Sequence, residues 1–124
     1  MSRNILLIDK DPAIIDVISL ILEEEGYSVL ISKKPFNLQE VIHHQPALIL
    51  LHNGLNNEGS FICQSIKYFQ GTNHIPVIMS STRPDLADIS KKSSADAYIQ
   101  KPFDIEDFLA LIKKTLIGSE SKNL

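Results

Sequence analysis

The chain has 124 residues, 44% hydrophobic and 22% charged, and a formal net charge of −3 at pH 7. This length suits one domain with its own core, and the negative charge argues mildly against a nucleic-acid-binding surface, because phosphate contacts need clustered Lys and Arg. The single cysteine, Cys63, excludes an intramolecular disulfide and points to a reducing compartment. No apolar run approaches the roughly 18 residues of a membrane span. We therefore expect a cytoplasmic domain with neither a nucleic-acid nor a membrane partner.

Short apolar runs alternate with longer amphipathic segments from the first residues onward. Residues 5–8 form the first expected strand. Asp11 and Pro12 suit the N-cap and first position of a helix that ends at Gly26. The next expected elements are a strand at 29–32, a helix at 38–44 and a strand at 48–51.

The second half of the chain continues this alternation. A loop rich in turn-forming residues leads into a helix at 60–70, whose expected apolar face consists of Phe61, Ile62, Ile66 and Phe69. The later expected elements are a strand at 76–80, a helix from Pro84 to about Ser93 and a strand at 97–100. Asp104 suits the cap of a last helix ending at Gly118, so we expect one domain over 1–118 and a frayed tail at 119–124.

Five strands and five helices in strict alternation predict a doubly wound α/β fold with a five-stranded parallel sheet. In such sheets, ligands bind beyond the carboxyl ends of the strands, near the point where the strand order reverses. The polar residues at these strand ends are Asp9, His52, Ser81 and Lys101.

Three segments carry a resemblance to a known family: ADAYIQKPF at 95–103, PVIMSS at 76–81 and NILLID at 4–9. Together they resemble the receiver domains of two-component response regulators, of the chemotaxis-response-regulator type, over about residues 3–117. The resemblance implies a flavodoxin-like fold with strand order 2-1-3-4-5. It also implies a pocket with a phosphate-accepting aspartate, magnesium-binding acids, a hydroxyl residue, and a lysine that a cis Lys-Pro peptide aims inward.

The chain departs from the receiver pattern inside that pocket. Lys10 stands where a second acid usually binds magnesium, and His52 stands where the aspartate is usually phosphorylated. Thr82 is bulkier than the small residue usual at its position, and we expect it to crowd the entry. The retained positions are Asp9, Ser81, Tyr98 and Lys101.

These substitutions predict that the usual phosphorylation chemistry is lost. Acyl-phosphate formation needs a carboxylate nucleophile and a divalent cation, and magnesium prefers carboxylate and water oxygens. With Lys10 and His52 in place of two acids, the pocket becomes net basic. We therefore expect neither magnesium nor another cofactor here, and no enzyme activity.

Several residues keep more than one role open. His52 is either a neutral, hydrogen-bonded imidazole, a phosphoryl acceptor or a metal ligand with Asp9. Asp11 is either a helix cap or a replacement metal ligand. Lys101 is either the ion-pair partner of Asp9 or an anion binder. A buried lysine needs a compensating charge, so we expect Lys101 within hydrogen-bonding range of Asp9 and Lys10 turned toward solvent.

The favoured function is that of a degenerate receiver domain in bacterial two-component or phosphorelay signalling, acting by protein–protein interaction. By the resemblance, its output or homodimer face lies on the fourth helix, fifth strand and fifth helix. The residues expected there are Ile89, Lys92, Tyr98, Gln100 and Leu111.

Two alternatives remain open at this point. The first is a phospho-competent response regulator that uses Asp9 or Asp11. The second is an anion-binding module that uses Lys10, His52 and Lys101.

Overall fold

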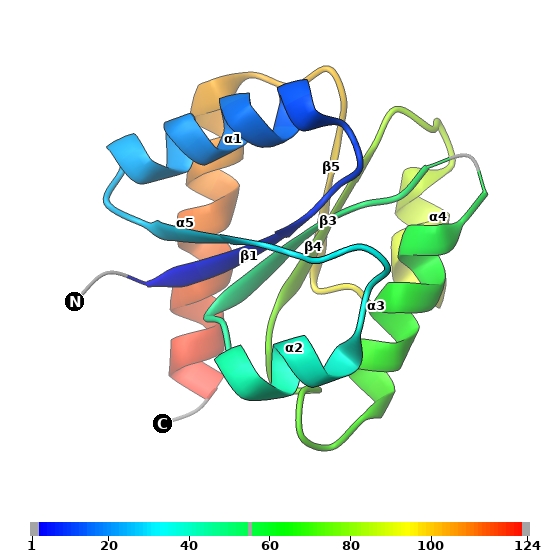
Figure 1. Cartoon of the computed structure of the whole chain (residues 1–124). Coiled ribbons are helices and arrows are strands. Elements are labelled where there is room, and N and C mark those ends of the chain that lie inside the picture. The colour runs from blue at the N-terminus through cyan, green and yellow to red at the C-terminus, as the bar shows by residue number, and fades with distance from the viewer. Residues whose placement is uncertain (1–2, 55, 123–124) are drawn as a thin grey trace.

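The computed structural model describes residues 3–122 with the exception of residue 55. Five parallel strands form one sheet in the order β2-β1-β3-β4-β5, which confirms the predicted fold and strand order (Figure 1). The strands are β1 (Asn4–Ile8), β2 (Ser28–Ile31), β3 (Leu48–His52), β4 (Val77–Ser81) and β5 (Ala97–Gln100). The helices are α1 (Pro12–Glu24), α2 (Leu38–His44), α3 (Glu58–Tyr68), α4 (Leu86–Lys92) and α5 (Ile105–Lys122).

The two faces of the sheet are covered by different helices, as Figure 1 shows. Successive strand residues point to opposite faces. Ile5 and Leu7 therefore pack in a cluster with residues of α1 and α5, while Leu6 and Ile8 pack in a second cluster with residues of α2, α3 and α4. Because both faces are buried, the central strands are continuously apolar, and polar residues collect where the strands end.

Local signals place the first helix as predicted. The Asp11 carboxylate accepts a hydrogen bond from the backbone N–H of Ala13 at 3.0 Å, and Pro12 is the first helical residue. Gly26 follows the helix with φ +92°, a left-handed conformation that glycine adopts without strain. Asp11 is thus a helix cap.

The last helix differs from its predicted end. It continues through Gly118, whose backbone is not left-handed, as far as Lys122. An ion pair of 2.8 Å between Arg3 and Glu120 joins its last turns to the start of β1. The predicted tail is therefore wrong for residues 119–122, and residues 123–124 lie outside the described residues.

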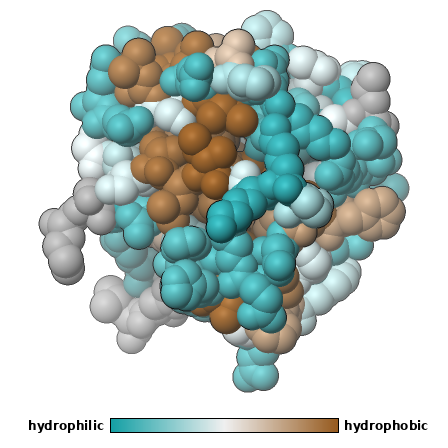
Figure 2. All heavy atoms as spheres, viewed as in Figure 1, coloured by the Kyte–Doolittle hydropathy of each residue, from teal (hydrophilic) through white to brown (hydrophobic). Residues whose placement is uncertain are grey.

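Hydrophobic side chains remain exposed over α1 and the neighbouring edge strand β2, where Figure 2 shows a brown patch. Val17, Leu20 and Ile31 are 54%, 60% and 52% exposed. Strand β2 pairs only with β1, so its other side is an open edge of the sheet. No helix in the described part of the chain is both long and apolar enough to span a membrane.

Candidate functional site

The parallel strands bring three of the predicted site residues together at the carboxyl edge of the sheet. Asp9 follows β1, His52 ends β3, and Lys101 follows β5. The Lys101 ammonium nitrogen lies 3.8 Å from Asp9 Oδ2 and 3.4 Å from His52 Nδ1. The peptide bond between Lys101 and Pro102 is cis, as the resemblance implies.

Asp9 holds the start of the adjoining loop as well as facing the lysine. Its side chain is 6% exposed, and its Oδ1 accepts hydrogen bonds from the backbone N–H groups of Lys10 at 2.7 Å and Asp11 at 3.2 Å. At 3.8 Å, the contact with Lys101 is an ion pair and lies beyond hydrogen-bonding distance. The expectation of a direct hydrogen bond is therefore wrong.

His52 is a neutral imidazole in this setting. Burial lowers its pKa, the nearby Lys101 ammonium lowers it further, and Asp9 only partly opposes both effects. An ammonium group has no lone pair to accept with, so the imidazole Nδ1 accepts from Lys101 and the ring proton sits on Nε2. A neutral ring at this strand end offers Lys101 an acceptor without a charge.

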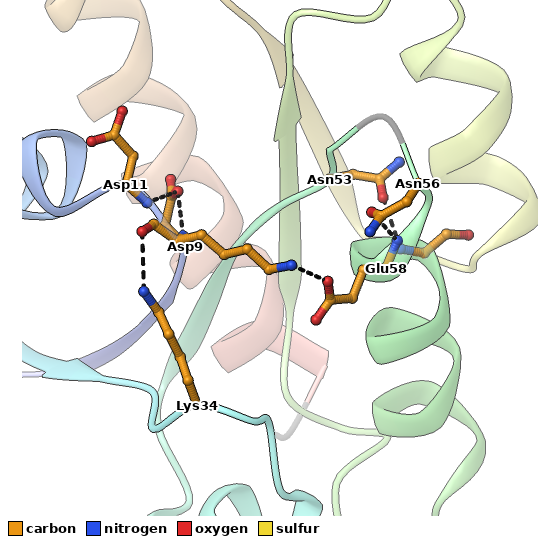
Figure 3. Close-up of polar contacts among 8 residues, drawn as sticks. Asp9, Asp11, Lys34, Asn53, Asn56 and Glu58 are labelled. Carbon is orange, nitrogen blue, oxygen red and sulfur yellow. Dashed lines mark hydrogen bonds and ion pairs between the residues drawn. The ribbon is translucent and has the colours of Figure 1, made fainter.

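Lys10 turns away from this cluster and joins two loops on its outer side. Its ammonium pairs with Glu58 at the start of α3, and its side chain is 67% exposed, as expected for a lysine facing solvent. This contact holds the pKa of the Glu58 carboxyl below its usual range. Lys34, in the loop after β2, donates to the Lys10 carbonyl oxygen at 3.0 Å (Figure 3). Lys10 therefore does not converge with His52 and Lys101.

Gly59 allows α3 to start close against the end of β3. A Cβ at this position would lie 2.6 Å from the His52 carbonyl oxygen and 2.8 Å from Asn53 Cα. The buried Asn53 side chain then accepts from the Ser60 backbone N–H at 3.1 Å. A side chain larger than hydrogen at residue 59 would push α3 away from the site.

Ser81, at the end of β4, is 1% exposed, and its hydroxyl oxygen accepts from the backbone N–H of Arg83 at 3.1 Å. Thr82 is exposed and lines neither cavity beside Asp9 and His52, so the expected crowding of the entry is not found.

Arg83, which was not predicted from the sequence, connects the loop after β4 with the start of α3 and with β5. It donates to Asn57 Oδ1 at 2.6 Å and makes two 3.0 Å hydrogen bonds to the Asp85 carboxylate. The Arg83 carbonyl oxygen accepts from Gln100 Nε2 at 2.9 Å. This loop is therefore tied both to the start of α3 and to β5.

The residues predicted for an output face lie on two sides of β5. Tyr98 and Gln100 are exposed, and their neighbours Ala97 and Ile99 pack against the α1 and α5 cluster. Leu111 packs against that same cluster, so β5 separates it from Tyr98. On the α4 side, Ile89 packs against the opposite cluster and Lys92 is exposed.

The donors beside Lys101 do not suit magnesium. Asp9 already uses one oxygen for two backbone N–H groups and directs the other toward an ammonium. Among the described residues, no group of three or more His, Cys, Asp or Glu side chains is placed to hold a metal ion. About 20 Å³ of space remains beside Lys101.

The fold and this cluster at the carboxyl edge of the sheet define a receiver-type signalling domain, and comparison with known proteins agrees. The family described as the response regulator receiver domain matches residues 5–113. The chain belongs to this family. A receiver domain protein from Methanospirillum hungatei, described as CheY-like, superposes with a TM-score of 0.86 at 29% identity, covering 98% of this chain and 99% of that one.

Relatives that include DNA-binding regulators correct one expectation. The DNA-binding dual master transcriptional regulator RpaA of Synechocystis is 37% identical over 91% of this chain and 48% of its own length. The response regulator ArlR of Staphylococcus saprophyticus is 37% identical over 98% of this chain and 56% of its own. The chain spans about half the length of these relatives. The expectation of no nucleic-acid partner, which rested on net charge, is contradicted by RpaA and by the DNA-binding response regulator MtrA of Mycolicibacterium smegmatis. MtrA is 27% identical over 98% of this chain and 54% of its own length.

Proposed function

We propose that this domain is a receiver that has lost aspartyl phosphorylation and that signals through contacts with other macromolecules. The observation that carries the proposal is His52 at the carboxyl end of β3, where the resemblance places the phosphate-accepting aspartate. A neutral imidazole accepting from Lys101 offers no carboxylate for acyl-phosphate formation. The proposal assigns the domain no catalytic activity.

The neighbouring acids give little support to the phospho-competent alternative. The carboxylate of Asp9 is engaged by two backbone N–H groups and faces Lys101, and Asp11 caps α1. Phosphorylation of either would break contacts that shape the loop after β1. Around Asp9, the described residues also provide no group of three or more His, Cys, Asp or Glu side chains placed to hold a divalent cation.

The contacts of Arg83 support a signalling surface that keeps one arrangement without a phosphoryl group. The Ser81 hydroxyl accepts from the Arg83 backbone, and Arg83 also links the loop after β4 to Asn57 and Gln100. We infer that partners contact the neighbouring surface of α4 and β5, where Tyr98 is 48% exposed.

The relatives' names indicate the kind of output. Since RpaA and MtrA are named as DNA-binding regulators, we propose that this domain controls a DNA-binding regulator or forms part of one. DNA is thus an expected partner of the regulator that this domain controls or belongs to. A cytoplasmic location remains a prediction that fits this role.

Incubation with acetyl phosphate and magnesium, followed by intact-mass spectrometry, tests the loss of phosphorylation. We expect no mass increase of one phosphate, and no magnesium binding in calorimetric titration at millimolar concentrations. A magnesium-dependent adduct mapped to Asp9 or Asp11 would establish the phospho-competent alternative. An adduct mapped to His52 would show that the imidazole has replaced the aspartate as acceptor.

A further inference from the structure

A cavity of about 570 Å³ opens beyond the carboxyl ends of β1, β2 and β3, on the α3 side of Asp9 and His52. We propose that this cavity binds a small amphipathic anion, a compound with an apolar body about the size of two fused rings and one carboxylate, sulfonate or phosphate group. The volume falls in the range of about 300–1,000 Å³ that small-molecule sites occupy. The site differs from the space beside Lys101, where about 20 Å³ remains.

Apolar groups form the walls of the cavity. Ile8 ends β1, Pro35 and Phe36 come from the loop after β2, and Ile62 comes from α3. Ile8 is 9% exposed, and Phe36 and Ile62 are partly buried. Gly59 at the start of α3 also lines the cavity and contributes no polar side chain to it. Such walls favour the burial of an apolar body and offer few polar partners to a bare inorganic ion.

The charges at the cavity favour an anion. Of the acids that line it, Glu58 pairs with Lys10, and Asp9 faces Lys101. The Asp11 carboxylate caps α1 and, among the described residues, forms no ion pair. Two of the three carboxylates that line the cavity, Asp9 and Glu58, are thus compensated by lysines.

The lysines on the β2 side are Lys33 and Lys34. Within the described part of the chain, neither Lys33 nor Lys34 forms an ion pair with a carboxylate. Glu40, outside the cavity, accepts from the backbone N–H of Lys33. Lys34 reaches across to the neutral Lys10 carbonyl oxygen (Figure 3). Lys33 and Lys34 thus provide two positive charges beside Phe36, while Asp11 is the carboxylate of the lining that faces no ammonium group among the described residues.

The placement of these groups sets the orientation of the ligand. Lys33 and Lys34 precede Pro35 and Phe36 in the same loop, so an anionic group held there directs the rest of the molecule toward Ile62. A ligand without the charge would keep the wall contacts and lose the attraction to the lysines. Binding needs neither phosphorylation nor magnesium, so this inference can fail while the proposed function stands.

Two fluorescent probes of matched shape test the site. 1-Anilinonaphthalene-8-sulfonate carries an anionic group, and N-phenyl-1-naphthylamine has the same rings without it. Both are titrated into the wild-type chain, into Lys33→Glu/Lys34→Glu and into the matched control Lys113→Glu/Lys114→Glu, which changes two exposed lysines of α5. Thermal melts monitored by circular dichroism confirm that each variant is folded, because the sulfonate probe also binds partly unfolded chains.

We expect saturable one-to-one binding of the sulfonate, weakened about three- to tenfold by Lys33→Glu/Lys34→Glu and unchanged in the α5 control. The uncharged probe should bind both variants equally. Ile62→Trp, which fills the cavity, should abolish binding of both probes. On the wild-type chain, amide shifts in nuclear magnetic resonance should cluster at residues 32–34, 36, 54 and 56–62.

Three results would overturn the inference. They are the absence of saturable binding, equal weakening by the α5 control, and amide shifts confined to another surface. The shift map needs no variant, so the test holds even if Ile62→Trp does not fold.

Discussion

At the scale of single residues, His52 and Asp9 both contact the ammonium group of Lys101. The imidazole accepts from the ammonium at 3.4 Å, and the carboxylate compensates its charge from 3.8 Å. Two backbone N–H groups hold Oδ1 of Asp9, which accounts for the longer ion pair. The predicted net basic charge of the pocket is not found, because Lys10 turns away to pair with Glu58 and leaves Lys101 facing Asp9. Residue types alone do not give this division of contacts, which depends on loop geometry.

Restoring phosphorylation should require two substitutions. His52→Asp alone returns a carboxylate at the end of β3, but Lys10 still stands where a second acid would bind magnesium. We expect weak labelling by acetyl phosphate in the single variant and magnesium-dependent labelling in Lys10→Asp/His52→Asp, which provides three acids with Asp9. Mass spectrometry under identical conditions compares them.

The single variant Lys10→Asp is the matched control, because it changes the metal position and leaves the imidazole in place. It should remain unlabelled. Strong labelling of His52→Asp alone would show that Lys10, paired with Glu58, does not obstruct the metal.

The lowered pKa of His52 predicts a loss of stability in mild acid. The unfolded chain takes up a proton at this residue near pH 6.5, while the folded chain does so only at lower pH. The contribution is therefore complete above about pH 6.5 and declines as the pH falls toward the folded-state pKa. Urea unfolding of wild type and His52→Asn between pH 8 and 5 measures it. A stability difference independent of pH would contradict this prediction.

At the scale of elements, the approach of α3 to β3 depends on Gly59. Gly59→Ala places a Cβ against the His52 carbonyl and Asn53 Cα, and since backbone atoms cannot rotate aside, we expect a loss of about 1–3 kcal/mol. Gly118→Ala is the matched control, because no atom lies within 4 Å of its added Cβ and it lies inside α5. It should gain about 0.5–1 kcal/mol. Denaturant unfolding measures both, and equal effects would contradict the close approach.

The positions of helices and strands were predicted correctly where capping residues and hydrophobic periodicity lie within the element or next to it. The predicted bounds of α2 and β5 agree with the structure, and Asp11 caps α1 as expected. Phe61 was expected on the buried face of α3 but is 68% exposed. The buried residues of this helix are Gly59, Cys63 and Ile66, and Phe61 lies about 200° around the helix from both Gly59 and Cys63. Periodicity alone does not identify which apolar residue finds a partner surface.

The candidate site was predictable only in part. Strand ends located Asp9, His52 and Lys101, because parallel strands carry their ends to one edge. Glu58 and Arg83 were missed as contact residues, since their partners Lys10 and Asn57 lie 48 and 26 positions away. Such loop contacts leave no local pattern.

At the scale of the whole molecule, net charge proved a poor guide to partners. The value of −3 describes this chain, while the DNA-binding relatives are about twice its length. A charge argument therefore applies to the surface of one domain and does not extend to longer proteins that contain such a domain.

The open edge of β2 also bears on how this protein behaves at high concentration. The edge exposes Ile31, which lines a surface cavity together with Leu20. After Ser32, the chain continues with Lys33, Lys34 and Pro35. Charged side chains and proline beside a bare strand discourage pairing between molecules. We expect Lys33→Ala/Lys34→Ala to self-associate in sedimentation velocity runs.

Lys113→Ala/Lys114→Ala removes the same charge from α5 and should stay monomeric, so a difference between the pairs measures protection of the edge and not overall repulsion. Equal self-association of the two double variants would mean that Lys33 and Lys34 do not prevent pairing through β2. On this prediction, the loop that lines the cavity also hinders the pairing of β2 with a strand of another molecule.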